Sequence, residues 1–382
     1  MTKTFTFTIK KNCQETWARI GNFVTPHGLI HTPVFMPCGT KGAVKSVSPD
    51  ELKTIGTEII LANTYHLMIR PGEDLIAKMG GLHKWMKWDK AILTDSGGFQ
   101  IFSLNHLRHI QDEGVEFQSH LDGSKHFVTP EKCIEIQYKL GADIIMAFDE
   151  CSPKNCSKQY AIKAMERTHK WAVRSLEKFK KLQKKKPSNQ TLFPIIQGGM
   201  FDDLRKESAV FMSQLNTKGI AIGGLSVGEK KEKMYHILEV IEPYLPKEKP
   251  RYLMGVGSPD DIIEAVARGI DMFDCVLPTR YARHGAFFSL YQRENIKNTH
   301  FKTDKKPLIE DCECYACQNF SKSYIRHLYI ENEIFAHRLL TIHNLHFLKN
   351  FMKEIQTQIK NGTFQSFRNN FKTHYKPMKG RC

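Results

Sequence analysis

Eight short apolar segments recur along this chain, and most of them stop abruptly at polar or glycine residues. Each segment has the length of a β-strand, and the sequence between successive segments leaves room for a helix. The segments are residues 33–39, 58–65, 91–97, 143–149, 192–198, 219–225, 251–257 and 271–277. Strands that alternate with helices are typical of a parallel sheet covered by helices.

Helical patterns do occur between the expected strands. Examples are residues 130–141, 158–183 and 258–269. The first of these begins with Pro130 and ends at Gly141, as helices commonly do. Eight strands with helical crossovers favour an α/β fold with a closed (β/α)8 TIM barrel over an open doubly wound sheet. No GxGxxG motif opens a helix, which also disfavours a dinucleotide-binding sheet.

The charge of the chain is strongly basic. The 382 residues include 56 Lys and Arg against 40 Asp and Glu, a formal net charge of +16. This excess favours a polyanionic partner such as nucleic acid, although a solvated lysine-rich surface would give the same balance. No apolar run reaches the roughly 18 residues of a membrane span, and the N-terminus lacks the apolar segment of a signal peptide. We therefore expect a cytoplasmic protein without membrane contact.

Three cysteines, Cys312, Cys314 and Cys317, form a C-x-C-x2-C cluster. Thiolates this close together, completed by a histidine, make the tetrahedral set that zinc prefers, and a fully protein-ligated ion is structural. Spacing alone leaves His337, His343 and His346 as candidates for the fourth ligand. Reduced buried cysteines without a metal are the alternative interpretation.

The two ends of the chain differ from its middle. Alternating, turn-rich residues at the start predict N-terminal β-hairpins, and the strand–helix rhythm breaks near residue 291. We expect a barrel catalytic region with its N-terminal β segment over 1–290. A zinc-binding subdomain over 291–350 and a C-terminal helix and tail that close the barrel over 351–382 would follow.

Asp95, Asp149 and Asp274 stand at the ends of three expected strands. Strand ends of a parallel barrel share one mouth, where neighbouring carboxylates have their pKa values pushed apart. One carboxylate can then act as a nucleophile at an anomeric carbon while another handles protons. A single strand-end aspartate, however, can equally cap a helix or bind a sugar or a metal.

Other residues at the expected mouth suit a flat ring and a polynucleotide. Gln197 and the nearby Gly-Gly pairs offer amide groups and close backbone approach, and Phe99 or Met254 could stack on a ring or simply fill the core. Arg280 and Arg283 follow Asp274, where the phosphates of a splayed-out nucleotide would pass.

With these motifs the chain resembles the bacterial tRNA-guanine transglycosylases, the queuine tRNA-ribosyltransferase family. The stretches that carry the resemblance run in order from about residue 35 to 345. They are TDSGGFQ, AFDEC, QGG, IGGLSVGE, MGVGSPDD, MFDCVLPTR with RHG, and CECYAC with His343. Together they are highly specific.

The resemblance implies a base exchange in the anticodon loop of tRNA. Guanine at the wobble position of G-U-N anticodons, in the tRNAs for Asp, Asn, His and Tyr, would be replaced by preQ1 (7-aminomethyl-7-deazaguanine) in queuosine biosynthesis. A covalent link between an aspartate and the ribose would carry the exchange, without ATP or a redox cofactor. Such enzymes are homodimers with one structural Zn²⁺ per subunit.

The resemblance also implies roles for individual residues. Asp274 would be the nucleophile and Asp95 the proton acceptor. The base would be bound by Asp95, Ser96, Gly97, Gly98, Phe99, Asp149, Gln197 and Gly224. RNA would be bound by Gly255, Val256, Gly257, Ser258, Pro259, Asp260, Asp261, Thr279, Arg280, Tyr281, Ala282 and Arg283. The zinc ligands would be Cys312, Cys314, Cys317 and His343.

Some residues refine or depart from the family pattern. Val227 and Cys151 match bacterial members that take preQ1, whereas members that take queuine tend to have Gly and Val there. Phe99 replaces a common Tyr, and Tyr281 and Ala282 fill a stretch that is often smaller. Two alternatives stand beside the transglycosylase: a non-catalytic, zinc-containing RNA-binding barrel protein, and an unrelated glycoside-hydrolase barrel.

Overall fold

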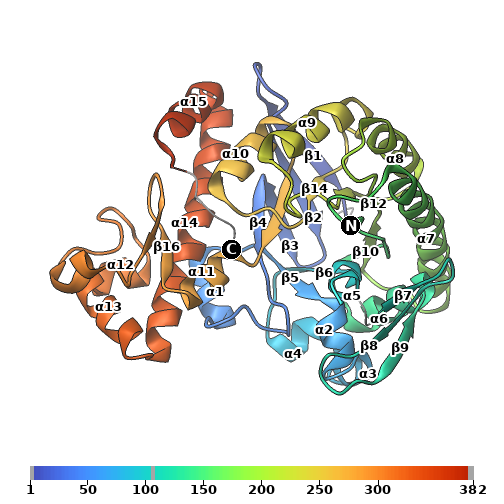
Figure 1. Cartoon of the computed structure of the whole chain (residues 1–382), viewed down its shortest axis with the longest axis horizontal. Helices are drawn as coiled ribbons and strands as arrows, with labels where there is room; N and C mark the ends of the chain where they lie inside the picture. Colours follow the sequence, from blue (N-terminus) through green and yellow to red (C-terminus); the bar gives the residue numbers. More distant parts are fainter. Residues whose placement is uncertain (1–3, 105–107, 377–382) are drawn as a thin grey trace.

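The computed structural model describes residues 4–104 and 108–376, and parallel strands form its centre (Figure 1). These strands are β4 (Val34–Pro37), β5 (Ile59–Asn63), β6 (Ala91–Asp95), β10 (Ile144–Met146), β11 (Thr191–Phe193), β12 (Ile195–Ile196), β13 (Ile220–Ile222), β14 (Arg251–Leu253) and β15 (Met272–Cys275). They pair in the orders β5-β6-β10-β11 and β12-β13-β14-β15-β4. Only Pro194 separates β11 from β12, and a parallel bridge joins Cys38, next to β4, to Leu61 of β5. The pairings thus return to β4, in the arrangement of the predicted (β/α)8 barrel.

The strand residues are buried on both faces, which explains their continuous apolar runs. Every residue of β5 and of β6 is buried. Because side chains alternate across a strand, Ile59 and Leu61 pack in the barrel interior with Phe193 and Met272. Ile60 points the other way, into the layer beneath the helices. The two-sided burial leaves the strand ends as the place where polar groups are accessible.

Helices lie outside the strands (Figure 1). They are α1 (Pro49–Ile55), α2 (Thr64–Ile69), α3 (Glu73–Lys78), α4 (Gly81–Met86), α5 (Gly98–Phe102), α6 (Pro130–Leu140), α7 (Lys158–Lys185), α8 (Asp202–Gln214), α9 (Lys231–Ile241), α10 (Pro259–Ala267) and α11 (Leu277–Arg283). The predicted ends of the 130–141 helix are confirmed. Thr129 caps its first turn, and Gly141 ends it with a φ of 77°.

Two small antiparallel sheets are attached to the barrel. The predicted N-terminal hairpins form β1 (Phe7–Asn12), β2 (Arg19–Thr25) and β3 (Gly28–Thr32), and Phe23 of β2 packs against Phe193 in the barrel interior. The second sheet, β7 (Arg108–Ile110), β8 (Val115–Gln118) and β9 (Lys125–Val128), is inserted between β6 and α6. The sequence pattern had not predicted this insertion.

The C-terminal region begins with the hairpin β16 (Ala286–Phe288) and β17 (Arg293–Asn295). The helices α12 (Tyr315–Asn319), α13 (Lys322–Ile330), α14 (Ile334–Asn361) and α15 (Phe364–His374) follow it. The domain division stays a prediction; α14 runs unbroken across its boundary at residue 350, and residues 377–382 of the expected tail lie outside the described residues. None of the described helices combines the length and apolar character that a bilayer crossing requires.

Candidate active site and metal centre

A cavity of about 1020 Å³ opens at the carboxyl ends of the barrel strands. Its walls include all three predicted strand-end aspartates. The other predicted base-binding residues, Ser96, Gly97, Gly98, Phe99, Gln197 and Gly224, also line it. The structure therefore brings the whole predicted base pocket together, although these residues come from separate strand ends.

Asp95 ends β6 and is held by the neighbouring strand end. Asn63 donates its Nδ2 to Oδ2 of Asp95 at 2.5 Å, and the Thr64 N–H donates to Oδ1 at 3.0 Å. Burial raises the pKa of Asp95 to about 7; the charge of Asp274 adds to the rise, whereas the Thr64 and Asn63 hydrogen bonds oppose it. Near neutral pH this carboxyl can thus accept or release a proton.

Asp274 lies on β15 with one carboxylate oxygen occupied and the other nearly free. Oδ1 accepts hydrogen bonds from the Tyr252 hydroxyl at 2.6 Å and the Gly255 N–H at 2.8 Å. Among the described residues, Oδ2 accepts a hydrogen bond only from the Cys38 thiol, at 3.5 Å. Burial raises the pKa of Asp274, and the bond from Tyr252 counteracts the rise. Oδ2 is therefore the carboxylate oxygen with the weaker hydrogen bonding.

Asp149 and Gln197, which follow β10 and β12, form a hydrogen-bonded pair across the cavity from Asp274. Gln197 Nε2 donates to Asp149 Oδ2 at 2.8 Å, and the Ser96 hydroxyl donates to Oδ1 at 3.0 Å. Burial raises the pKa of Asp149 to about 6, against the effect of these two bonds. Gln197 Oε1 is buried and has no partner among the described residues. An unpaired buried acceptor is costly, so this oxygen is ready to accept a bond from a ligand N–H.

Two positions beside the Asp149–Gln197 pair, Gly98 and Gly224, have no room for a side chain. A Cβ on Gly98 would lie 2.9 Å from both Asp149 O and Oδ1, and a Cβ on Gly224 would collide with Gln197 Oε1. Gly97 and Gly224 also have φ values of 74° and 65°, in the left-handed region that favours glycine. These glycines keep the backbone close to the polar pair and leave space for a flat ligand.

The 223–229 loop is braced from within. Arg205, on α8, is fully buried and donates to the carbonyls of Gly223 at 2.8 Å and Gly224 at 3.1 Å. Glu229 accepts hydrogen bonds from the N–H groups of Ser226 and Val227. These contacts fix the orientation of the peptide groups facing the cavity.

The predicted RNA-binding segments, 255–261 and 279–283, border the cavity, but most of their side chains are buried. Gly255 and Arg280 are exposed, and Asp260 and Arg283 are half-buried. The buried members are Val256, Gly257, Ser258, Pro259, Asp261, Thr279, Tyr281 and Ala282. Arg280 and Arg283 are the basic residues of these segments, and neither is buried.

The predicted metal ligands converge, and the structure distinguishes among the three histidines. His343 Nδ1 lies 3.8, 3.6 and 3.4 Å from the sulfurs of Cys312, Cys314 and Cys317. With bonds of about 2.3 Å to sulfur and 2.0 Å to nitrogen, a tetrahedral ion would place these atoms roughly 3.5 Å apart. All four residues are buried, and their ligand atoms lie within 4.8 Å of one another. The set can therefore hold a metal ion.

The other two histidines fit less well. His346 Nδ1 lies 3.6 Å from Cys312 and 3.4 Å from the amide of Asn350. His337 points toward the carbonyl of Ala282. His343, by contrast, also places its Nε2 2.8 Å from the Phe288 carbonyl, the kind of contact that orients a ligating imidazole.

A second His-carboxylate group, at the opposite end of the barrel strands, has a different geometry. His27 and His83 contact the two oxygens of Asp143 at 2.7 and 3.1 Å. Their rings stack with centroids 3.6 Å apart and planes inclined by 16°. Nearly parallel, stacked rings cannot both direct in-plane lone pairs at one ion, so we interpret this group as a hydrogen-bonded clasp between the β2–β3 turn and α4.

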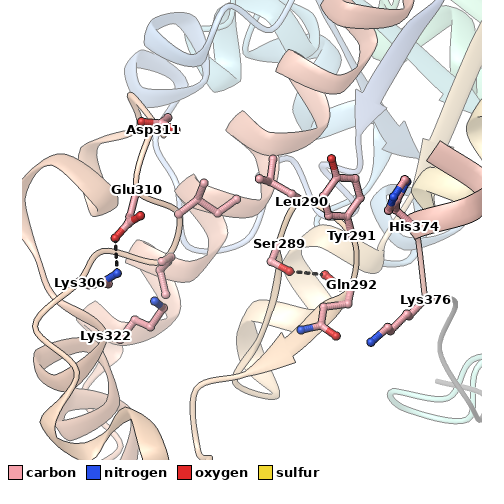
Figure 2. A pocket seen from close by; sticks show the side chains of 12 residues that line it. Ser289, Leu290, Tyr291, Gln292, Lys306, Glu310, Asp311, Lys322, His374 and Lys376 are labelled. Carbon is pink, nitrogen blue, oxygen red and sulfur yellow. Dashed lines mark hydrogen bonds and ion pairs between the residues drawn. The ribbon is translucent and has the colours of Figure 1, made fainter. Parts of the chain in front are cut away.

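A smaller cavity, of about 570 Å³, lies within the C-terminal region, between the turn of the β16–β17 hairpin, residues 306–311 and the end of α15 (Figure 2). Its charged groups are partly paired, as in the 2.7 Å contact between Lys306 Nζ and Glu310 Oε1. The side chains of both residues are mostly exposed, at 67% and 62%. None of the predicted catalytic or metal-binding residues lines this cavity.

Comparison with known proteins decides the family. The family model described as queuine tRNA-ribosyltransferase matches residues 13–377. This chain belongs to that family. Curated relatives named queuine tRNA-ribosyltransferase include one from Thermoanaerobacter sp. (strain X514), 55% identical over 96% of each chain. The relative from Bacillus subtilis (strain 168) is 52% identical over 96% of this chain and 94% of its own.

Membership of the queuine tRNA-ribosyltransferase family confirms the resemblance and makes the chain a transferase of the tRNA-guanine transglycosylase type. Sequence reasoning nevertheless missed three residues that hold the site of this family member: Asn63, Tyr252 and Arg205. Asn63 ends an expected strand and carried a usable positional signal. Tyr252 lies within a strand and Arg205 within a helix, so only the folded structure reveals their partners.

Proposed function

We propose that this enzyme replaces guanine at the wobble position of G-U-N tRNAs with preQ1 through a covalent Asp274–ribose intermediate. The observation that carries the proposal is the placement of Asp274, Asp95 and the Asp149–Gln197 pair around one cavity at the strand ends. A nucleophile, a proton carrier and a base-recognition pair are the parts that exchange at an anomeric carbon requires.

The chemistry begins when Oδ2 of Asp274 attacks ribose C1′. The bond between C1′ and guanine N9 breaks, its electron pair passes to the guanine, and a proton from Asp95 neutralises the leaving base. The Tyr252 hydroxyl and the Gly255 N–H hold Oδ1 throughout, which keeps the carboxylate aligned for attack.

The second half reverses these steps with a different base. Ionised Asp95 accepts the N9 proton of preQ1 while N9 attacks C1′, and the bond from C1′ to Asp274 breaks. A carboxyl that donates in one half and accepts in the other works best with a pKa near the operating pH, and the pKa of about 7 at Asp95 meets that need. Protons and charge balance over the cycle, so no co-reactant is needed.

Base recognition falls to the opposite wall. Asp149 and the free Oε1 of Gln197 would accept the N–H groups on the edge of the guanine-like ring, while Ser96 to Gly98 and Gly224 let the ring approach the backbone. Phe99, 54% exposed at the mouth, would stack on the ring. Val227 also lines the cavity, where its size would limit the substituent to that of preQ1, and Cys151 lines the cavity as well.

The remaining assignments concern the metal and the partners. We infer that Cys312, Cys314, Cys317 and His343 bind one structural Zn²⁺, because three thiolates and an imidazole with no open position match its preference. We further infer a cytoplasmic homodimer that acts on tRNA, with the exposed residues of 255–261 and 279–283 touching the anticodon loop.

Incorporation of labelled guanine into unmodified tRNA with a G-U-N anticodon tests the proposal. Incorporation that preQ1 suppresses, and that a tRNA with another wobble base does not support, is the expected result. Folded, metal-loaded protein that incorporates no guanine but still binds the tRNA would instead favour the non-catalytic RNA-binding alternative.

A further inference from the structure

We propose that Cys38 is a positioning residue for the nucleophile: its thiol donates a hydrogen bond to Oδ2 of the free Asp274 carboxylate and thereby shortens the life of the covalent RNA adduct. The inference rests on the proposed function, in which Oδ2 bonds to ribose C1′. Cys38 lies outside the sequence stretches that carry the family resemblance.

The fold places Cys38 beside the nucleophile. β4 pairs in parallel with β15, with Met36 opposite Asp274, and Cys38 directly follows the end of β4. A parallel bridge joins Cys38 to Leu61 of β5. Met36 and Cys38 both pack in the barrel interior, because side chains two residues apart share a face of a strand. The thiol is therefore held where the first and last strands of the barrel meet.

The thiol contacts the nucleophile from outside the substrate cavity. Cys38 Sγ lies 3.5 Å from Asp274 Oδ2, and the two residues are only 5% and 9% exposed. Among the described residues, those that line the strand-end cavity include Asp274 but not Cys38. Any effect of the thiol on the reaction must therefore pass through Asp274.

The thiol of Cys38 keeps its proton. Burial raises the pKa of Cys38 well above its ordinary value, and the charge of Asp274 raises it further. The thiol is thus the donor and the carboxylate oxygen the acceptor. The hydrogen bond in turn opposes the rise that burial causes in the pKa of Asp274.

The donors around Asp274 differ in strength between its two oxygens. Oδ1 accepts hydrogen bonds from the Tyr252 hydroxyl at 2.6 Å and the Gly255 N–H at 2.8 Å, whereas the donor to Oδ2 is the thiol at 3.5 Å. A thiol is a weaker donor than a hydroxyl or an amide. It can therefore orient Oδ2 and still release this oxygen readily when the bond to carbon forms.

The hydrogen bond from Cys38 distinguishes the free nucleophile from the adduct. A donor binds a charged carboxylate oxygen more strongly than a neutral oxygen. Oδ2 loses its negative charge when it becomes the ester oxygen of the adduct, so the thiol stabilises the free carboxylate relative to the ester. This difference favours the departure of Asp274 from C1′ in the second half of the exchange.

Two substitutions of opposite size test the proposal. Cys38→Ala shortens the side chain and Cys38→Val enlarges it, but both remove the donor. Val34→Ala is the control, because it removes volume from the same interior cluster at a position opposite Met272 rather than Asp274. Each full-length variant is incubated with a G-U-N anticodon stem-loop and increasing guanine, and the RNA-linked band is measured at equilibrium on a denaturing gel.

Both Cys38 variants should need about three- to tenfold more guanine than the wild type to release half of the linked RNA. Loss of one hydrogen bond to the free carboxylate shifts the equilibrium toward the adduct by about this factor. The control should stay within about twofold of the wild type. The acid limb of kcat/KM for tRNA should also move to higher pH in both Cys38 variants, because the thiol lowers the pKa of Asp274.

An infrared measurement tests the same bond without any change to Cys38. Conversion of the wild-type enzyme to the RNA adduct should shift an S–H stretching band to higher frequency, because the thiol loses its charged acceptor. Asp274→Asn, which replaces the charged oxygen by a neutral amide, should shift the band in the same direction. This measurement still decides the matter if the Cys38 variants fold poorly.

Three results would overturn the proposal. An unchanged guanine requirement in both Cys38 variants, or changes in opposite directions, would assign the thiol to packing alone. An equal increase in Val34→Ala would lead to the same conclusion. S–H bands that adduct formation leaves unaltered would show that the thiol does not bond to Oδ2. Failure of the wild type to form any RNA-linked band would instead mark the failure of the proposed function itself.

Discussion

The two cavities of this protein differ in how deeply the charged side chains that line them are buried. The strand-end cavity is walled by aspartates that are less than a tenth exposed, at 6–9%, and fixed by hydrogen bonds from neighbouring strands. The cavity of Figure 2 is walled by a hairpin, loop residues and a helix end, and its Lys306–Glu310 pair is largely in water. Concave space is present in both, but among the described residues only those that line the first include carboxyl groups whose pKa values burial has raised toward neutrality.

The difference in pKa values follows from the burial of the charged groups in each wall. A buried carboxylate costs free energy that a rigid barrel can bear, because the strands hold its hydrogen-bond donors in place. An exposed ion pair costs little and contributes little, since water screens it. The volume of a cavity therefore says less about chemistry than the burial of the charges in its walls.

Removal of the nucleophile should separate the two cavities most sharply. Asp274→Ala is expected to lower guanine exchange by at least about 1000-fold, as loss of a nucleophile commonly does. RNA binding should remain near the wild-type value. A denaturing gel should show an RNA-linked band for the wild type only, and exchange that survives in the variant would refute the nucleophile assignment.

Loss of the metal should loosen the wall of the smaller cavity while sparing the larger one. Cys317→Ser should lose the bound metal and destabilise the C-terminal region by at least about 3 kcal/mol, because ligand binding and local folding are coupled there. Hydrogen exchange should rise in the segment around Glu310 and stay slow in β6 and β15. His346→Ala is the control and should retain one metal per chain; loss of metal from it would contradict the choice of His343.

The pH dependence should differ between the cavities as well. Burial raises the pKa of Asp95 to about 7. The incoming base needs ionised Asp95, so kcat/KM for preQ1 should fall about tenfold per pH unit below that value, whereas kcat/KM for tRNA should fall above it because the leaving guanine needs protonated Asp95. In contrast, the hydrogen bond from Lys306 lowers the pKa of Glu310, which leaves it ionised over the same range. A flat profile between about pH 5 and 8 would argue against Asp95 as the proton carrier.

The same carboxyl should make stability depend on pH. Folding raises the pKa of Asp95 above its unfolded value of about 4, so its contribution is lost as pH rises from there to about 7. At about pH 8, Asp95→Asn should therefore be about 1–3 kcal/mol more stable than wild type by urea titration, with the difference shrinking to nothing below about pH 4. A variant that is less stable than wild type under the alkaline condition would contradict this view of Asp95.

The smallest effect is expected in the smaller cavity. Glu310→Gln breaks the exposed pair of Figure 2 and should change guanine exchange by less than about twofold. A larger loss would show that this cavity takes part in the reaction, and the comparison of the two cavities would then fail.

Much of this could be predicted from sequence because periodicity and strand-end position are local signals. The buried strands read as apolar runs, and Asp95, Asp149 and Asp274 stand where such runs end. Tyr252 and Arg205 gave no such signal, since each acts through a partner far away in the chain.

The pairing of β4 with β15 has a consequence for how the protein is made. Cys38 and Asp274, which meet at this seam, are 236 positions apart in the chain. Gln356 of α14 also bonds to the carbonyls of His31 and Pro33, just before β4. During synthesis one edge of β4, the first strand of the barrel, therefore stays unpaired until β15 and most of the chain have left the ribosome. The nucleophile receives its neighbour at that same late moment, so the growing chain has no assembled catalytic pocket before it is nearly complete.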